Sequence, residues 1–334
     1  MTDTVDARPL LEGARPERDA GFARYIRSGA TLETKAFTGT TGEGGGVAIP
    51  TQLDDRIDAQ LVGLSPIRAI ANVVQVGSAG YRKLITSGGT PSGWAGETDP
   101  RPVTATPTFH ELVPPGGELY ANPSASQAML DDALFDAEAW LAAEIATEFA
   151  KAEGAAFVDG SGEGRPRGFL RAPLGAAPDG RRAFGTLQYL PSGAAGDFAG
   201  DPAERLIDLV QALRAPYRQG ACFVMNAATA ARVRKVKTRD GQFLWQPGLA
   251  AAQPATLLGY PVVEAEDMPD VAPDSPALAF GNFRLGYLIA DRGETAVLRD
   301  PYSNKPFVTF YATRRVAGCV ADSDAIKLLK FAEK

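Results

Sequence analysis

Histidine and cysteine are nearly absent from this chain, and their scarcity limits the chemistry it can perform. Its 334 residues include one histidine, His110, and two cysteines, Cys222 and Cys319. A histidine-based catalytic triad would have to use His110, and no GxSxG serine elbow accompanies it. The two cysteines lie far apart and outside any CxxC spacing, so we expect two buried thiols. The sequence therefore predicts no enzyme, no cofactor and no metal site.

Excess positive charge and long apolar runs are missing as well. The formal net charge of −6 argues against an extensive basic surface for nucleic acid or for anionic lipid. No apolar run approaches the roughly 18 residues of a membrane span, and the N-terminal MTDTVDARP lacks the regions of a secretory signal. We expect a chain that folds in the cytoplasm, stays out of membranes and contacts DNA weakly. Its apolar content of 45% is enough for a sizeable core and favours at least two lobes.

The clearest feature present is a long amphipathic helix that begins near Asp136, a residue suited to cap it. Apolar residues recur at steps of three or four and so share one side of the helix. The residues expected on this apolar stripe are Leu141, Ile145, Phe149, Ala152 and Ala156. Those expected in water are Glu144, Glu148, Lys151 and Glu153. A glycine-rich loop from Asp159 to Gly168 ends the helix, which at about six turns is about 33 Å long and suits a spine.

The N-terminal residues 1–46 contain few large apolar side chains and end in a glycine-rich run, which is typical of an arm without its own core. Phe22 and Tyr25 fit one short helical stripe there, and nothing nearby in sequence would cover it. We expect a neighbouring subunit to cover these two side chains. From residue 47 the pattern tightens, and residues 47–71 predict a short strand and a helix.

Residues 72–113 predict an extended loop. Polar and β-branched residues alternate around Gly77 and Gly80, which favours a hairpin, and a proline-rich stretch then returns. A two-stranded ribbon of this length cannot bury an apolar face by itself. We expect another molecule to cover it, and the residues chosen for that contact are Tyr81, Leu84 and Trp94. The alternative is an ordinary surface hairpin that packs on its own domain.

The rest of the chain divides into four parts. Residues 114–170 hold a strand, a short helix and the spine, and residues 171–200 are rich in Gly, Ala and Pro and predict a variable loop. Residues 201–282 predict an α/β lobe, because an amphipathic helix precedes strand, helix and strand patterns. The apolar face of that first helix is expected to hold Leu206, Leu209, Val210 and Leu213. Residues 283–334 predict three strands.

Several of these segments, taken in order, resemble the tailed-phage major capsid protein family, whose fold was first described for phage Hong Kong 97. The landmarks are GGGVAIPTQLDDRI, the spine helix with SGEGRPRGFL after it, and then CFVMN, DGQFLWQP, LLGYPV and AFGNF. They cover about residues 44–334 apart from 171–200. The turn LETKAF resembles the segment at which alphaproteobacterial gene-transfer-agent and prophage capsid proteins are trimmed, which falls between Lys35 and Ala36 here.

The resemblance implies an α+β fold of the Hong Kong 97 type. Its implied divisions are an N-terminal arm (1–46), a strand and helix leading into the body (47–71), an extended loop (72–113), a peripheral domain with the spine helix (114–170), a variable loop (171–200), an axial domain (201–282) and the C-terminal strands of the peripheral domain (283–334). Lys83 is expected to be a further intersubunit contact residue, because the resemblance places it where some relatives form an isopeptide bond. The asparagine and glutamate that this bond requires have no match here.

The implied function is that of a major capsid protein. Such proteins assemble through pentamers and hexamers into an icosahedral shell that encloses the double-stranded DNA of a tailed phage, prophage or gene transfer agent without sequence-specific binding. The implied partners are other copies of the chain, a portal, a scaffold or protease, and head-completion proteins. The implied location is the virion capsid, after assembly in the bacterial cytoplasm. An encapsulin-like nanocompartment shell is the alternative, and the LETKAF and RDGQFLWQP segments favour the phage-type shell.

Two other chemistries fit the residues less well. The paired carboxylates Asp131 and Asp132 point different ways on a helix, so they suit helix capping better than glycoside hydrolysis. Arg165 and Arg167 could hold a phosphate, but their loop follows a helix and lacks a GK[ST] lysine. The sequence therefore disfavours a hydrolase and a nucleotide site.

Overall fold

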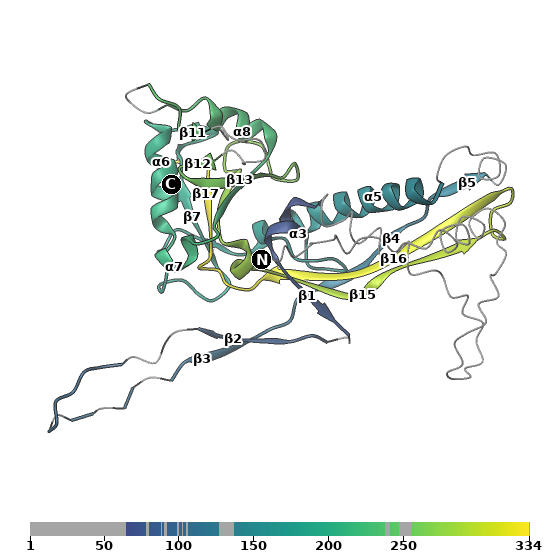
Figure 1. Cartoon of the computed structure of the whole chain (residues 1–334). Helices are drawn as coiled ribbons and strands as arrows, with labels where there is room; N and C mark the ends of the chain where they lie inside the picture. The colour runs from purple at the N-terminus through teal and green to yellow at the C-terminus, as the bar shows by residue number, and fades with distance from the viewer. Residues whose placement is uncertain are drawn as a thin grey trace, which may run out of the picture. The chain divides into compact units, whose positions relative to one another are not determined.

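The computed structural model of the chain describes most residues from Ser65 onward (Figure 1). The described residues are 65–77, 80–87, 89, 92–98, 100–101, 103–104, 106–126, 137–237, 241–246 and 256–333. Predictions that lie outside them concern the arm, the strand and helix before residue 65, and Phe22, Tyr25, Lys35, Ala36, Asp131, Asp132 and Asp136. No helix in the described part of the chain is long and apolar enough to span a membrane.

The chain divides into two compact units. The described residues of the first lie within Tyr120–Ala146 and Thr295–Thr313. The second comprises Leu61–Leu119, Thr147–Glu294 and Arg314–Lys334. Three long elements contribute residues to both units, namely α5 (Ala137–Asp159), β15 (Tyr287–Asp300) and β16 (Phe307–Val320).

An eight-stranded sheet forms the centre of the second unit. Its spatial order is β11-β12-β13-β10-β14-β17-β7-β6. The bounds in that order are β11 (Trp245–Gln246), β12 (Thr256–Leu257), β13 (Tyr260–Glu264), β10 (Cys222–Met225), β14 (Leu278–Gly281), β17 (Ile326–Lys330), β7 (Leu187–Pro191) and β6 (Leu174–Gly175). The parallel pairing of β10 with β13, joined through α8 (Ala227–Arg234), confirms the predicted strand, helix and strand succession.

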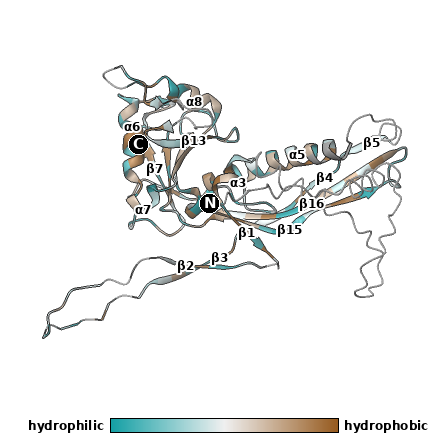
Figure 2. Ribbon diagram, in the orientation of Figure 1, coloured by the Kyte–Doolittle hydropathy of each residue, from teal (hydrophilic) through white to brown (hydrophobic). Residues whose placement is uncertain are grey.

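Helix α6 (Pro202–Ala212) covers part of this sheet's core, and α7 (Ala215–Arg218) follows it. Asp201 caps α6 by accepting a 2.9 Å hydrogen bond from the backbone N–H of Ala203, and Pro202 occupies the first helical position. Figure 2 shows hydrophobic and hydrophilic segments alternating along α6. The predicted apolar face is confirmed, because all its members are buried, namely Leu206, Leu209, Val210 and Leu213. They pack with strand residues such as Phe223 and Phe280.

The sheet takes in two segments that the sequence assigned elsewhere. Residues 171–200 were expected to form a variable loop, but β6 and β7 lie there, together with the small hairpin of β8 (Gly193–Ala194) and β9 (Asp197–Phe198). Residues 326–330 were expected to belong with the peripheral strands, but β17 pairs with β14 on one side and β7 on the other. All four residues from Ile326 to Leu329 are buried, which a central strand requires.

A five-stranded sheet holds the long strands β15 and β16, which Figure 1 shows as a twisted pair. Its order is β1-β15-β16-β4, and β5 pairs separately with β16. The short members are β1 (Asn72–Val76), β4 (Gly116–Ala121) and β5 (Ser124–Ser126). The sequence placed residues 72–76 in the extended hairpin, but β1 instead runs parallel to β15, with Asn72 opposite Leu288. The chain turns away after it at Gly80, whose φ of +92° is a conformation that glycine adopts readily.

Helix α5 is the predicted spine, and its 23 residues span about 35 Å. Leu141, Ile145 and Phe149 are buried as expected. Beyond them the stripe continues through Glu153 and Phe157, whereas Ala152 is exposed and Ala156 is half-buried. Glu153, predicted to face water, is therefore buried, because its partners are arginines from distant parts of the chain.

The end of α5 packs into a second hydrophobic core. The rings of Phe157 and Phe169 pack edge-on against Tyr287, and Phe283 packs edge-on against Phe169. The hydroxyl of Tyr287 donates a 2.9 Å hydrogen bond to the backbone oxygen of Arg167. The short helices around this core are α3 (Pro66–Ile70), η1 (Phe169–Arg171) and α9 (Phe283–Gly286). Cys222 belongs to this core. Both cysteines are buried free thiols, as predicted, and burial raises the pKa of each to about 12.

Candidate assembly interface

The hairpin of β2 (Lys83–Ser87) and β3 (Thr108–Leu112) stands as a separate two-stranded sheet, drawn as a narrow ribbon in Figure 1. Its antiparallel register places Lys83 opposite Leu112 and Ile85 opposite His110. Among the strands that the structure describes, none pairs with either of these two. Because an isolated ribbon is marginal in water, the hairpin needs further contacts to be stable.

Large apolar side chains on the hairpin lie in water. Leu84 is 71% exposed, and Trp94 in the stretch between the strands is fully exposed. The other exposed large apolar side chains of this segment are Val103, Phe109 and Val113. Burying such a side chain contributes about 1.5–3 kcal/mol relative to leaving it in water. A row of them on an uncovered ribbon therefore marks a surface suited to a protein partner.

The root of the hairpin contacts the chain's own body. The ring of His110 stacks on that of Phe184, with centroids 4.3 Å apart and ring planes within 2° of parallel. Tyr81 lines a cavity of about 320 Å³ together with residues of β15 and β16, among them Arg292 and Val316. The hairpin is thus held where it leaves the body, and its apolar residues farther along remain uncovered.

The predicted contact residues on this loop fall into two pairs. Leu84 and Trp94 are exposed, as a docking surface requires, whereas Tyr81 and Lys83 are half-buried near the root. The contact between His110 and Phe184 was not predicted from the sequence. The two residues are 74 positions apart, and no sequence pattern links their segments. The single histidine, His110, is a half-buried residue of β3.

A buried ion cluster joins α3, α5 and the two long strands within the second unit. Its members are Arg68, Glu153, Asp291 and Arg314. Arg68 donates from Nε to Glu153 at 2.9 Å and from Nη1 to Asp291 at 2.6 Å. Arg314 donates to Asp291 at 2.9 Å. Burial raises the pKa of Glu153, and the positive charges of the two arginines oppose that rise.

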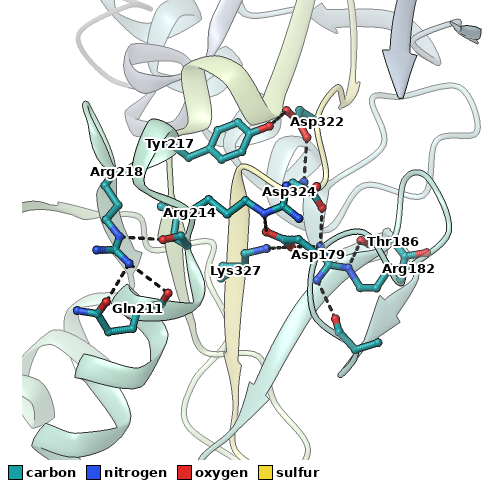
Figure 3. A network of polar contacts seen from close by, with 12 residues as sticks. Asp179, Arg182, Thr186, Gln211, Arg214, Tyr217, Arg218, Asp322, Asp324 and Lys327 are labelled. Carbon is teal, nitrogen blue, oxygen red and sulfur yellow. Dashed lines mark hydrogen bonds and ion pairs between the residues drawn. The ribbon is translucent and has the colours of Figure 1, made fainter. Parts of the chain in front are cut away.

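A second network ties the 171–186 segment to β17 (Figure 3). Asp179 accepts from Arg182 at 2.7 Å and from the buried Lys327, and Arg214 approaches it at 3.2 Å. Arg182 also contacts Asp324 at 2.8 Å. Burial raises the pKa of Asp179, but the hydrogen bonds and charges of Lys327 and Arg182 outweigh burial and hold it below its usual range. Burial and the charge of Asp179 together raise the pKa of Asp324.

Both networks bind parts of one chain together, and neither has the geometry of a catalytic site. Every charged member faces an opposite charge, so none is placed as a free nucleophile or base. In the part of the chain that the structure describes, no group of three His, Cys, Asp or Glu side chains could hold a metal ion. Among the described residues, the exposed apolar side chains of the hairpin are the candidate for contact with a partner.

The described chain thus combines a spine helix, a five-stranded sheet, an eight-stranded sheet and a separate two-stranded ribbon. A family model described as the phage capsid family matches residues 45–331, and the chain belongs to that family. The Hong Kong 97-type fold expected from the sequence is thereby confirmed, together with the resemblance that implied it.

Solved structures agree with this assignment. The chain is 46% identical to the capsid of an empty GTA (gene transfer agent) particle computed with C5 symmetry, over 91% of this chain and 98% of that one, with a TM-score of 0.71. It is 45% identical to the capsid of a native GTA particle, over 92% and 98% of the chains, with the same TM-score. A chain of the Microbacterium phage Oxtober96 shares the fold at 12% identity and a TM-score of 0.57, over 91% and 96% of the chains. No curated protein sequence matches.

The comparisons support the phage-type shell over the encapsulin-like nanocompartment. The family is one of structural capsid proteins.

Proposed function

We propose that this chain is the major shell subunit of a gene-transfer-agent or tailed-phage capsid, and that it assembles through pentamers and hexamers into a closed icosahedral container for double-stranded DNA. The observation that carries the proposal is the 46% identity to a GTA capsid over 91% of this chain. The container role is mechanical and requires no catalytic step. Symmetric repetition of one interface makes many weak contacts add up in a closed shell.

The hairpin supplies the contact that repeats. Leu84 and Trp94 lie against an adjacent copy in this proposal, and Tyr81 and Lys83 support the hairpin near its root. Phe22 and Tyr25 of the arm add a second contact between copies. The residue at position 83 acts by contact alone, without an isopeptide bond to a neighbour.

The remaining partners follow from the same role. A portal, a scaffold or protease and head-completion proteins complete the particle, which is assembled in the bacterial cytoplasm and holds DNA without reading its sequence. Cleavage between Lys35 and Ala36 accompanies maturation. Mass spectrometry of purified particles tests this last step, because subunits that begin at Ala36 are expected and subunits that begin at Met1 would contradict it.

Electron microscopy of the purified chain tests the proposed function. Full-length protein, concentrated to the micromolar range, is expected to form closed polyhedral particles in negative stain. If the folded chain stays monomeric at high concentration in every solution condition tested, the shell role is contradicted.

A further inference from the structure

The end of α8 and the turn that follows it carry the densest positive charge in the chain. The window 232–239, RVRKVKTR, holds five cationic residues and no acidic one, namely Arg232, Arg234, Lys235, Lys237 and Arg239. Outside this stretch, no window of eight residues in the sequence holds more than three Lys or Arg residues. In a chain with a net charge of −6, this concentration is a local feature and not a consequence of composition.

The backbone that carries these side chains is fixed. Helix α8 ends at Arg234, and the backbone N–H of Lys235 donates to the carbonyl of Arg232 at 3.1 Å. Two residues later Lys237 forms a β-bridge with Phe243, and Leu244 donates to the carbonyl of Val236 at 3.2 Å. Arg232, Lys235 and Lys237 all project from this frame as exposed side chains.

The positive charge is only partly neutralised. Arg234 pairs with Glu264 at 2.7 Å. Within the described residues, no acidic side chain pairs with Arg232, Lys235 or Lys237. Cations in the last turn of a helix are favoured by its dipole, which accounts for Arg232 and Arg234. The dipole acts only within the last turn, so it does not account for Lys237 beyond the helix.

From this arrangement we propose that residues 232–237 form a binding surface for the phosphate backbone of duplex DNA. Of the aromatic rings nearby, Trp245 is buried and lies 4.7 Å from the Arg234 guanidinium, and the exposed ring of Phe243 carries Lys237 Nζ 4.7 Å from its centroid. A single exposed ring does not provide the series of stacking surfaces that single-stranded binding uses. The surface therefore contacts phosphates only, without sequence preference.

This inference rests on the proposed function, because a shell that encloses DNA presents its subunits with duplex at high local concentration. Each cation that neutralises a phosphate releases a counterion, so it adds about 0.9 to the slope of log affinity against log salt concentration. The contribution of the surface can therefore be measured as a change in that slope, separately from any change in assembly.

The test measures binding of a fluorescent 30-base-pair duplex, about three helical turns, to the purified full chain by anisotropy at several salt concentrations. The variant Arg232→Gln/Lys235→Gln/Lys237→Gln is expected to lower the slope by about 2.7, the sum of three phosphate contacts. The matched control, Arg165→Gln/Arg181→Gln/Arg284→Gln, removes the same charge from exposed arginines elsewhere and is expected to keep most of the slope. The variant Lys235→Arg/Lys237→Arg keeps the charge and is expected to bind as the unchanged chain does.

The outcomes separate the inference from the proposed function. Equal loss of slope in both triple variants would show that only net charge matters and would overturn the inference. Tighter binding of a single-stranded oligonucleotide of the same length would overturn the duplex assignment. The triple variant at residues 232–237 could bind duplex as the unchanged chain does, while the unchanged chain forms closed particles. That result would support the shell role and overturn the DNA-binding surface. Circular dichroism of each variant confirms that it folds before its affinity is interpreted.

Discussion

Arg68 and Glu153, 85 residues apart in the sequence, are joined by a 2.9 Å hydrogen bond from Arg68 Nε to Glu153 Oε2, and both side chains are almost completely buried. The contact fixes the spine helix to the helix at the start of the described body. Asp291 and Arg314 complete the cluster, so two positive and two negative charges balance away from water. Such a cluster is strong only while it is complete, because each charge depends on its partners to offset its desolvation.

Removing one member of this cluster should therefore destabilise the fold strongly. The variant Asp291→Asn leaves Arg68 and Arg314 with Glu153 alone, and we expect a loss of about 3–5 kcal/mol in the free energy of unfolding. Urea unfolding of unassembled subunits measures it. The control Glu144→Gln, on the exposed side of the spine helix, should change stability by less than about 0.5 kcal/mol. Equal midpoints for the two variants would contradict a stabilising role for the cluster.

The burial of Glu153 could not be predicted from the local sequence. The apolar spacing of Leu141, Ile145 and Phe149 continues equally well to residues 152 and 156 or to residues 153 and 157, and the alanines looked like the apolar choice. The structure takes the second path because Arg68 and Arg314 provide the countercharge. No pattern within the helix predicts that arginines so far away in the sequence will pair with Glu153.

The fold divides in the same way between local and distant causes. Helices α5, α6 and α8 and strands β10 and β13 were predictable, because periodicity and capping residues such as Asp201 act within a few residues. The sheet to which a short buried strand belongs was not predictable. The apolar run of β17 would suit pairing with the long strands as well as its actual pairing with β14 and β7, so the choice depends on contacts distant in sequence.

The candidate interface was predictable for one reason. A ribbon that cannot bury its own apolar face exposes residues such as Leu84 and Trp94 wherever its root is attached. The attachment of that root was not predictable, because the stacking of His110 on Phe184 depends on how the 171–200 segment folds.

The Asp179 network predicts a specific dependence of stability on pH. The pKa of Asp179 is held below its unfolded value of about 3.9, so its contribution is present above that pH and is lost as the pH falls through the folded pKa. The variant Asp179→Asn should therefore show a smaller loss of unfolding free energy between pH 7 and pH 3 than the unchanged chain. Urea unfolding of subunits at the two pH values, which span the unfolded pKa, measures this.

Asp324 supplies a control of opposite sign in the same network. Its pKa is raised in the folded chain, so protonation at low pH favours the folded state. Asp324→Asn should therefore make the acid-induced loss larger. If the two variants shifted the acid response in the same direction, the assignment of opposite pKa changes to the two carboxyls would be wrong.

The two buried thiols should be unreactive in the folded chain. Burial raises the pKa of Cys222 and of Cys319 to about 12, so almost none of the reactive thiolate is present at pH 8. Ellman's reagent is expected to modify neither residue in native subunits and to modify both in denaturant. The variant Ala231→Cys, on the exposed side of α8, should add one rapidly reacting thiol. Rapid reaction of two thiols in the unchanged native chain would contradict the burial.

A close backbone approach between β4 and the loop after α5 predicts a penalty for one added methyl group. A Cβ at Gly117 would lie 1.8 Å from the carbonyl oxygen of Gly164, so one backbone segment must move. Gly117→Ala should cost about 1–3 kcal/mol of unfolding free energy. Thermal unfolding of both variants measures this. At Gly77 an added Cβ meets nothing within 4 Å, so Gly77→Ala should be neutral or slightly stabilising. Similar melting temperatures for the two variants would rule out the close approach.

The exposed row on the hairpin should separate assembly from folding. Leu84 and Trp94 already lie in water in the subunit, so the double variant Leu84→Ser/Trp94→Ser should change the subunit's unfolding free energy by less than about 1 kcal/mol. If an adjacent copy buries them in the shell, the same change removes about 1.5–3 kcal/mol per side chain from each contact. The critical concentration for assembly, measured by light scattering and checked by electron microscopy, should rise at least about tenfold.

Two exposed threonines on the same hairpin provide the comparison for this assembly measurement. The variant Thr86→Ser/Thr104→Ser alters the same ribbon but removes little apolar area, so its critical concentration should match that of the unchanged chain. Because both variants preserve the strand pairing of β2 with β3, a difference between them isolates the apolar contact. If instead both pairs of substitutions left assembly unchanged, the hairpin would not be the repeating contact, and the interface would have to be sought on another surface of the subunit.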